Sequence, residues 1–135
     1  QCEEFNCSYC TNLTSLSGAP QQCGIFNCSH CTNLTSLSGA PQQCEEFNCS
    51  YCTNLTSLSG IPQQCQIFDF SHCEKIYDIK ELLYNCLNYE EIKTSNIKFL
   101  DSNSILTFIS LLSSYYKVQN KHKKLYDSVI NAINN

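Results

Sequence analysis

Residues 1–21 read QCEEFNCSYCTNLTSLSGAPQ, residues 22–42 read QCGIFNCSHCTNLTSLSGAPQ, and residues 43–63 read QCEEFNCSYCTNLTSLSGIPQ. A degenerate fourth copy begins at residue 64 as QCQIFDFSHCEKIYDI. A fixed period of 21 residues is typical of solenoids, in which each copy adds one turn to a stack and buries its apolar face against its neighbours. The repeat therefore decides the architecture of this part of the chain.

Each copy carries the pattern of a short strand followed by a segment that leads the chain back to the start of the next strand. Its apolar or cysteine positions in the first copy are Cys2, Phe5, Cys7, Cys10, Leu13 and Leu16. Alternate side chains of a strand point to opposite faces, so we expect Phe5 and Cys7 to point inward and Asn6 and Ser8 outward. Leu13 and Leu16 are expected to fill the opposite, convex side, before Gly18 and Pro20 turn the chain toward the next copy.

This spacing, L-x-x-L-x-L-x-x-C-x-x-L with cysteine or phenylalanine at some leucine positions, resembles the leucine-rich-repeat family from residue 1 to about residue 79. The segment L-T-S-L-x-G-x-P followed by F-N-C-S is similar to short repeats in proteins of large DNA viruses and bacteriophages. The resemblance implies an α/β solenoid, a leucine-rich-repeat-like stack of short parallel strands. The chain departs from the family where the usual asparagine of the ladder is replaced by Cys10, Cys31, Cys52 and Cys73.

The C-terminal part changes period and predicts helices. Asp78 is followed three residues later by Glu81, a capping-box-like start, and apolar residues then recur at helical spacing. Further helical patterns run from about residue 104 to 117 and from about 121 to 134. We therefore expect two parts. The first is a solenoid over 1–77, made of repeats 1–21, 22–42, 43–63 and a partial 64–77. The second, 78–135, is an α-helical C-terminal cap of about three helices.

Twelve cysteines allow three interpretations: stacked core thiols, zinc ligands or disulfides. Cys7 and Cys10 form a C-x-x-C motif that recurs in the next two copies with zinc-ribbon spacing. Core thiols are favoured because Phe70 occupies the Cys7 position in the fourth copy, and phenylalanine cannot bind a metal. Adjacent copies bring equivalent Cα atoms within disulfide range, but their parallel side chains are poorly angled for a bond. We expect no metal and no cofactor.

Charge and glycosylation motifs bear on partners and compartment. Residues 1–74 contain no Lys or Arg and are acidic, which disfavours nucleic acid as a partner, and no apolar run is long enough to span a membrane. Six N-x-S/T motifs recur with the repeat, yet glycans spaced at ~4.8 Å along one face could not all fit. These features favour a reducing intracellular compartment, such as host cytoplasm, or a virion over secretion. Because the chain starts inside a repeat, we expect further repeats upstream in a longer protein.

The sequence predicts a non-enzymatic protein, since it contains no nucleophile elbow, phosphate-binding glycine loop or HExxH motif. We expect a protein–protein interaction or structural assembly module, as a component of a viral particle or as a virus-encoded host-interacting protein. The alternatives are a zinc-stabilised Cys-rich domain and an extracellular disulfide-rich recognition domain. A protein partner, within a larger assembly, is expected to contact the outward strand face at Asn6, Tyr9, Asn27, His30, Asn48, Tyr51, Asp69 and His72.

Overall fold

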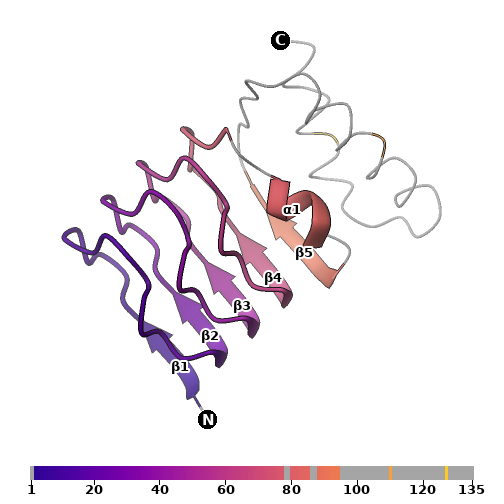
Figure 1. The fold of residues 1–135 in the computed structure, drawn as a ribbon, viewed down its shortest axis with the longest axis horizontal. Coiled ribbons are helices and arrows are strands. Elements are labelled where there is room, and N and C mark those ends of the chain that lie inside the picture. Colours follow the sequence, from indigo (N-terminus) through magenta and orange to yellow (C-terminus); the bar gives the residue numbers. More distant parts are fainter. Residues whose placement is uncertain (1, 78–79, 86–87, 95–109, 111–126, 128–135) are drawn as a thin grey trace.

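The computed structural model describes residues 2–77, 80–85, 88–94, 110 and 127. Its strands are β1 (Cys2–Asn6), β2 (Gln22–Asn27), β3 (Gln43–Asn48), β4 (Gln64–Asp69) and β5 (Tyr89–Lys93), and α1 (Lys80–Asn85) lies between β4 and β5. The strands form a five-stranded sheet in chain order, with every neighbouring pair parallel (Figure 1).

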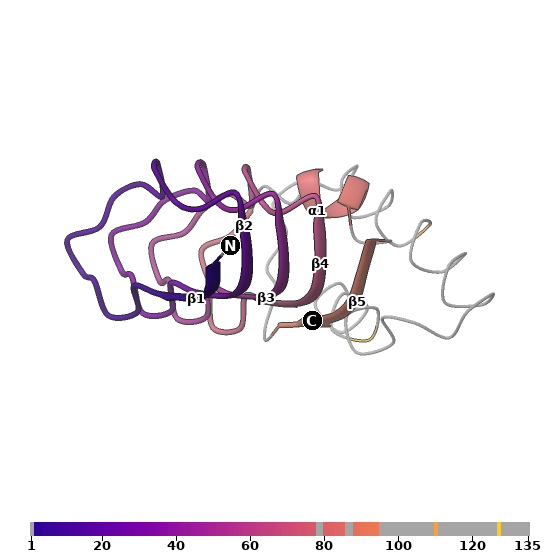
Figure 2. The ribbon, with the colours of Figure 1, turned by 90° about the horizontal axis from the view of Figure 1, so that it is seen from below.

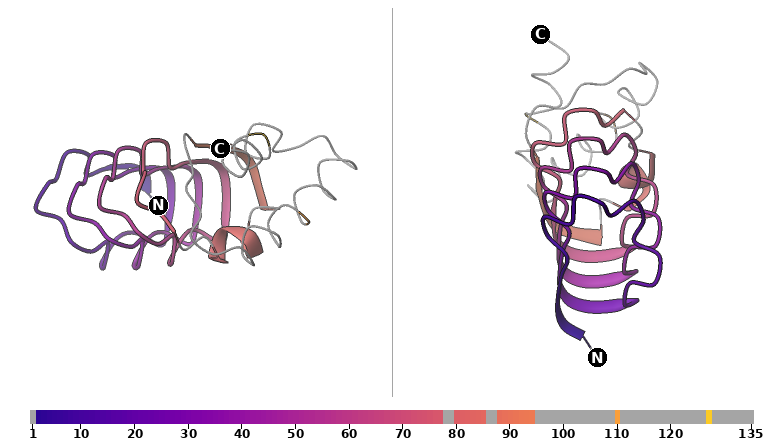
Figure 3. Two further views of the ribbon diagram at one scale, coloured as in Figure 1. Left: turned by 90° about the horizontal axis from the view of Figure 1, so that it is seen from above. Right: turned by 90° about the vertical axis from the view of Figure 1, so that its left-hand side faces the viewer.

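The repeats stack in register, one repeat to a turn. Cys23 pairs with Cys2 on one side and Cys44 on the other, and Phe26 lies in the same way between Phe5 and Phe47. Successive coils therefore follow the same path, as the side and end views show (Figures 2 and 3). The four repeats form a parallel-strand β-solenoid of about four turns.

The centre of the solenoid holds a column of phenylalanine rings, the interior ladder, formed by Phe5, Phe26, Phe47 and Phe68. Its ring centroids are separated by 5.2, 5.2 and 5.7 Å, and the last three rings are 0% exposed. Burying one such side chain stabilises the fold by about 1.5–3 kcal/mol. The inward direction predicted for the Phe5 and Cys7 positions is thus confirmed, as is the burial of the leucines.

The strand's alternation stops sooner than the sequence pattern predicts, so the outward assignment of the Ser8 position is wrong. Ser29 and Ser50 are only 7% and 9% exposed. The reason is a turn: the Asn27 side-chain oxygen accepts the backbone N–H of Ser29 at 2.9 Å and folds the chain back directly after the strand. The Ser29 carbonyl then accepts the N–H of Tyr9 in the preceding coil, which encloses the serine between coils.

Glycine is required in the S-G-x-P turn near the end of the second and third repeats, where adjacent coils pack closely. Gly39 and Gly60 have φ of 93° and 94°, a region that side chains rarely adopt. A Cβ on Gly39 would lie 2.5 Å from the Ser17 nitrogen, and one on Gly60 would lie 2.5 Å from the Leu37 carbonyl oxygen. A residue with a side chain would therefore be strained in its backbone and would clash with the adjacent coil at these positions.

The sheet continues beyond residue 77, the end of the solenoid expected from the sequence. β5, which the helical pattern did not predict, pairs with β4 and places the buried Tyr89 beside Cys65 and Ile92 beside Phe68. Tyr89 donates its hydroxyl hydrogen to the Pro62 carbonyl, and its ring centroid lies 5.5 Å from that of Phe68.

α1 occupies part of the segment in which the first helix is expected. The two later helices expected from the sequence lie outside the described residues except at Ser110 and Asp127. The Glu81 carboxylate accepts the Gly60 N–H at 2.7 Å and the Ser59 hydroxyl at 3.2 Å. This contact joins α1 to the turn of the third repeat. The equivalent turn of the second repeat contacts the next coil instead, because the Leu37 N–H donates to the Ser59 carbonyl.

Candidate functional site

A second column of stacked rings, the surface ladder, lies on the outside of the solenoid and consists of Tyr9, His30, Tyr51 and His72. Ring centroids of neighbours are 4.2, 4.5 and 4.4 Å apart, with interplanar angles of 7°, 6° and 14°. Tyr9 is 67% exposed and Tyr51 41%. The rings stack face to face along the column, so their edges are the parts that a partner could reach.

The surface ladder lies in the turn that follows each strand, and not on the strand face itself. The N-C-S segment builds this turn, because the Asn48 side-chain oxygen accepts the Ser50 N–H at 2.9 Å, with Asp69 doing the same for Ser71. The N–H of Tyr51 then donates to the Ser71 carbonyl of the next coil at 2.9 Å. The turn is fixed within each coil by its asparagine or aspartate and between coils by the backbone.

Each residue of the surface ladder has a left-handed backbone conformation. The φ angles are 62° at Tyr9, 58° at His30, 57° at Tyr51 and 60° at His72. This region disfavours residues with a Cβ by about 1–2 kcal/mol, and bulky residues are seldom found there. Glycine or asparagine would fit the backbone more easily, yet tyrosine or histidine occupies this position in every repeat.

The asparagine column predicted to contact a partner is engaged within the protein. Asn27, Asn48 and Asp69 are half-buried, and their side-chain oxygens hold the turn described above. Asn6, in the first coil, is exposed and accepts both the N–H and the hydroxyl of Ser8, at 2.9 and 2.6 Å. The structure thus places the predicted Asn/Asp and Tyr/His residues in adjacent columns, of which the Tyr/His column is the more open.

A hollow of about 270 Å³ adjoins the C-terminal end of the surface ladder, where the repeat degenerates. It is lined by Tyr51, Thr53, His72, Glu74 and Lys75. Lys75 donates to the Asn54 side-chain oxygen at 2.8 Å, which joins the fourth repeat to the third. Charged residues thus accompany the ladder only at this end, because the first three repeats carry Thr and Asn at the positions of Glu74 and Lys75.

The C-x-x-C cysteines of the second and third repeats are buried inside the solenoid, whereas in the first repeat Cys7 is half-buried and Cys10 is exposed. The Cys52 thiol donates to the Cys28 carbonyl at 3.2 Å, and the Cys73 thiol donates to the Cys49 carbonyl at 3.1 Å. Burial raises the pKa of Cys49 well above its usual value, as expected for a thiol enclosed in apolar surroundings. The eleven described cysteines are free thiols, and within the described ranges no three metal-binding side chains are grouped as an ion would require.

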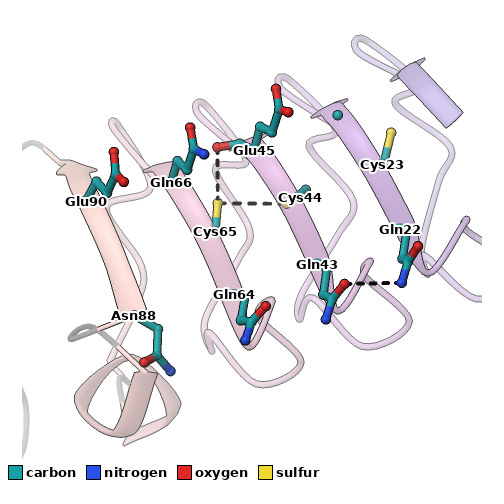
Figure 4. Close-up of a pocket in the computed structure, with 11 residues that line it drawn as sticks. Gln22, Cys23, Gln43, Cys44, Glu45, Gln64, Cys65, Gln66, Asn88 and Glu90 are labelled. Atoms are coloured by element: carbon teal, nitrogen blue, oxygen red, sulfur yellow. Dashed lines mark hydrogen bonds between the residues drawn. The ribbon is translucent and has the colours of Figure 1, made fainter. Parts of the chain in front are cut away.

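A feature that the sequence did not reveal is a groove of about 440 Å³ across the starts of β2 to β5. Its lining includes the glutamine column Gln22, Gln43 and Gln64 and the thiols of Cys23, Cys44 and Cys65 (Figure 4). The Gln22 amide donates to the Gln43 side-chain oxygen at 3.1 Å. The recurring Q-Q-C triplet was the available signal, but a two-residue alternation does not predict that Cys23 and Phe26 are both buried.

Comparison with family models, curated proteins and solved structures found no match to the chain. In the part of the chain that the structure describes, no helix has the length and apolar character needed to cross a membrane.

Proposed function

We propose that the chain is a non-enzymatic protein–protein interaction or assembly module of the leucine-rich-repeat type, and that its surface ladder contacts the partner. The observation that carries this proposal is the tyrosine or histidine kept in a left-handed turn in four successive repeats. Strained backbone positions are concentrated at functional sites.

A comparison of ring stacking with backbone strain supports the surface ladder as the contact site. Stacking between two aromatic rings contributes about 0.5–1.5 kcal/mol, which is close to the strain of about 1–2 kcal/mol at each left-handed residue. Over the whole column, three stacking contacts stand against four strained positions, so fold stability gives little reason to prefer these four rings over glycine. Recognition of a partner supplies a reason.

The chemistry of the surface ladder suits a protein partner. Tyrosine combines a large apolar ring with a hydroxyl group and few rotatable bonds, which is why it is enriched among residues that dominate binding energy. Histidine adds ring nitrogens that donate or accept hydrogen bonds. A partner that covers both columns would also meet the partly exposed neighbours Asn6, Asn27, Asn48 and Asp69.

The proposed setting is a reducing compartment, either the cytoplasm of an infected host cell or a viral particle, as the resemblance to viral repeats suggests. Titration of denatured protein should then find more than half of the twelve thiols reduced, and elemental analysis should find less than one zinc per chain. Stoichiometric zinc would instead favour the zinc-stabilised alternative. A majority of oxidised thiols would favour the extracellular one.

Site-specific photo-crosslinking tests the proposed surface. A photoreactive phenylalanine analogue is placed at Tyr51, in the ladder, and separately at Tyr77, which is 50% exposed but outside it. A third variant carries it at Ser38, beside the Gly39 turn. In extracts of cells that make the protein, the Tyr51 variant should capture a protein that the other two do not.

Competition completes this test. Unlabelled wild-type chain should abolish the crosslink at Tyr51, and a chain with Tyr9→Ala and Tyr51→Ala should compete poorly although it remains folded. Capture only from Ser38 or Tyr77 would place the interface elsewhere and contradict the proposal.

A further inference from the structure

Two close pairs of thiols lie at the starts of the strands, and one pair, Cys44 and Cys65, lines the groove. The sulfur atoms of Cys2 and Cys23 are 3.1 Å apart, and those of Cys44 and Cys65 are 3.8 Å apart. Each pair also occupies directly opposed positions of neighbouring parallel strands. Strands lie ~4.8 Å apart, which is inside the Cα separation of about 4.4–6.8 Å that a disulfide requires. The poor angle expected for parallel side chains therefore does not keep the sulfur atoms of these two pairs apart.

We propose that these pairs are oxidative modification sites, at which a low-molecular-weight disulfide of the glutathione type converts Cys44 with Cys65, and Cys2 with Cys23, into disulfides that join adjacent coils. Such bonds would link the first repeat to the second and the third to the fourth. The interior thiols would remain reduced.

The thiols of the groove differ from those of the interior in their access to solvent. Cys44 is half-buried and lines the groove with Cys23 and Cys65 (Figure 4). The interior Cys28 and Cys52 thiols also contact each other, but both are 0% exposed. A dissolved disulfide can therefore reach Cys44 in the folded protein, whereas it reaches Cys28 only after the solenoid opens.

The chemistry is a two-step exchange that balances without a further oxidant. The Cys44 thiol loses its proton and attacks glutathione disulfide, forming a mixed disulfide and releasing one glutathione thiolate, which takes up that proton. The Cys65 thiol then loses its proton and attacks the Cys44 sulfur, displacing the second glutathione. Two protein thiols are oxidised to one disulfide, and one glutathione disulfide is reduced to two thiols.

The local environment predicts how this exchange depends on pH. Burial and the adjacent Cys2 thiol raise the pKa of Cys23 to about 11, and the hydrogen bond with Cys65 and burial raise that of Cys44 well above its usual value. Because only the thiolate attacks, the reaction is slow at neutral pH. Its rate should increase about tenfold per pH unit between pH 7 and 9.

The test uses the full chain with glutathione disulfide at pH 8 and 9, followed by alkylation and mass analysis under non-reducing conditions. Repeats 1 and 3 are nearly identical, so the variants assign the bonds. The wild type should form two internal disulfides. Cys65→Ser should form one, and should carry a glutathione on Cys44. Cys10→Ser, which removes an exposed thiol outside the groove, is the matched control and should still form two.

Thermal unfolding of the oxidised and reduced protein provides a second test that does not depend on the fold of one variant. Oxidised wild type should unfold at a midpoint about 5 °C or more above the reduced protein, because each bond closes a loop of about 20 residues, and Cys44→Ser/Cys65→Ser should lose part of this gain. The proposal is overturned if the Cys65→Ser variant still forms two internal disulfides. It is also overturned if Cys28 and Cys52 are oxidised while the groove thiols remain open to alkylation.

Discussion

Two columns of stacked rings run through the same four repeats, one inside the solenoid and one on its surface. The interior ladder has centroid spacings of 5.2–5.7 Å and rings that are fully buried after the first, whereas the surface ladder has spacings of 4.2–4.5 Å and exposed edges. Stacking follows from the repeat in both cases, because identical positions in successive coils lie beside each other. Stacking alone therefore does not distinguish a structural column from a binding surface.

Burial and backbone conformation make that distinction. The interior ladder comes from strand residues, and each of its rings removes a large apolar area from water. The surface ladder comes from left-handed turn residues whose strain offsets much of what their stacking contributes. The same 21-residue repeat thus supports the fold with one aromatic column and displays the other.

The largest expected effect comes from removing the cover at the end of the interior ladder. A chain that ends near Asp78 lacks β5, so Phe68 loses the Tyr89 ring and the Phe70 N–H loses the Lys93 carbonyl that accepts it at 2.9 Å. We expect aggregation or fraying of the fourth repeat, measured by light scattering and by thermal unfolding. A soluble truncated chain that unfolds cooperatively would show that the solenoid does not need this cover.

Truncating one ring of the interior ladder should have the next largest effect. Phe47→Ala removes a fully buried ring and leaves a cavity between Phe26 and Phe68, which should lower the free energy of unfolding by about 3–5 kcal/mol. Urea denaturation measures this loss. A loss no larger than that of Tyr51→Ala in the surface ladder would remove the distinction between the two columns.

A smaller effect should appear as the pH is raised. Burial raises the pKa of Cys49 above its unfolded value, so the folded chain retains a proton that the unfolded chain releases. This contribution to stability is fully present below the unfolded thiol value of about 8.5 and is lost as the pH rises above it. The unfolding midpoint should therefore decrease between pH 8 and 10, and less steeply in Cys49→Ala. Equal slopes in the two proteins would contradict this.

The sequence was sufficient to predict the parallel stack, the register and the buried Phe, Leu and Cys columns, because a fixed period places identical residues beside each other. It does not predict the turn at N-C-S, because strand alternation was extended through this segment, although asparagine two residues before serine also favours a side-chain-capped turn. As a result, Ser29 was placed outside and Tyr51 on the strand face. β5 was missed because Tyr89 and Ile92 lie outside the repeat, and their pairing depends on the exposed edge of β4.

The central claim, that the surface ladder serves recognition and the interior ladder serves stability, is tested most directly by two measurements on Tyr51→Ala. One is its affinity for the partner captured by crosslinking, and the other is its denaturant midpoint, each compared with wild type and with Tyr77→Ala. We predict that Tyr51→Ala weakens binding by about 1–2 kcal/mol, roughly 5- to 30-fold in Kd, and lowers stability by less than the about 3–5 kcal/mol expected for Phe47→Ala, because the lost ring is partly exposed. Tyr77→Ala should change neither appreciably. A Tyr51→Ala chain that loses stability yet binds its partner as tightly as wild type would contradict the account.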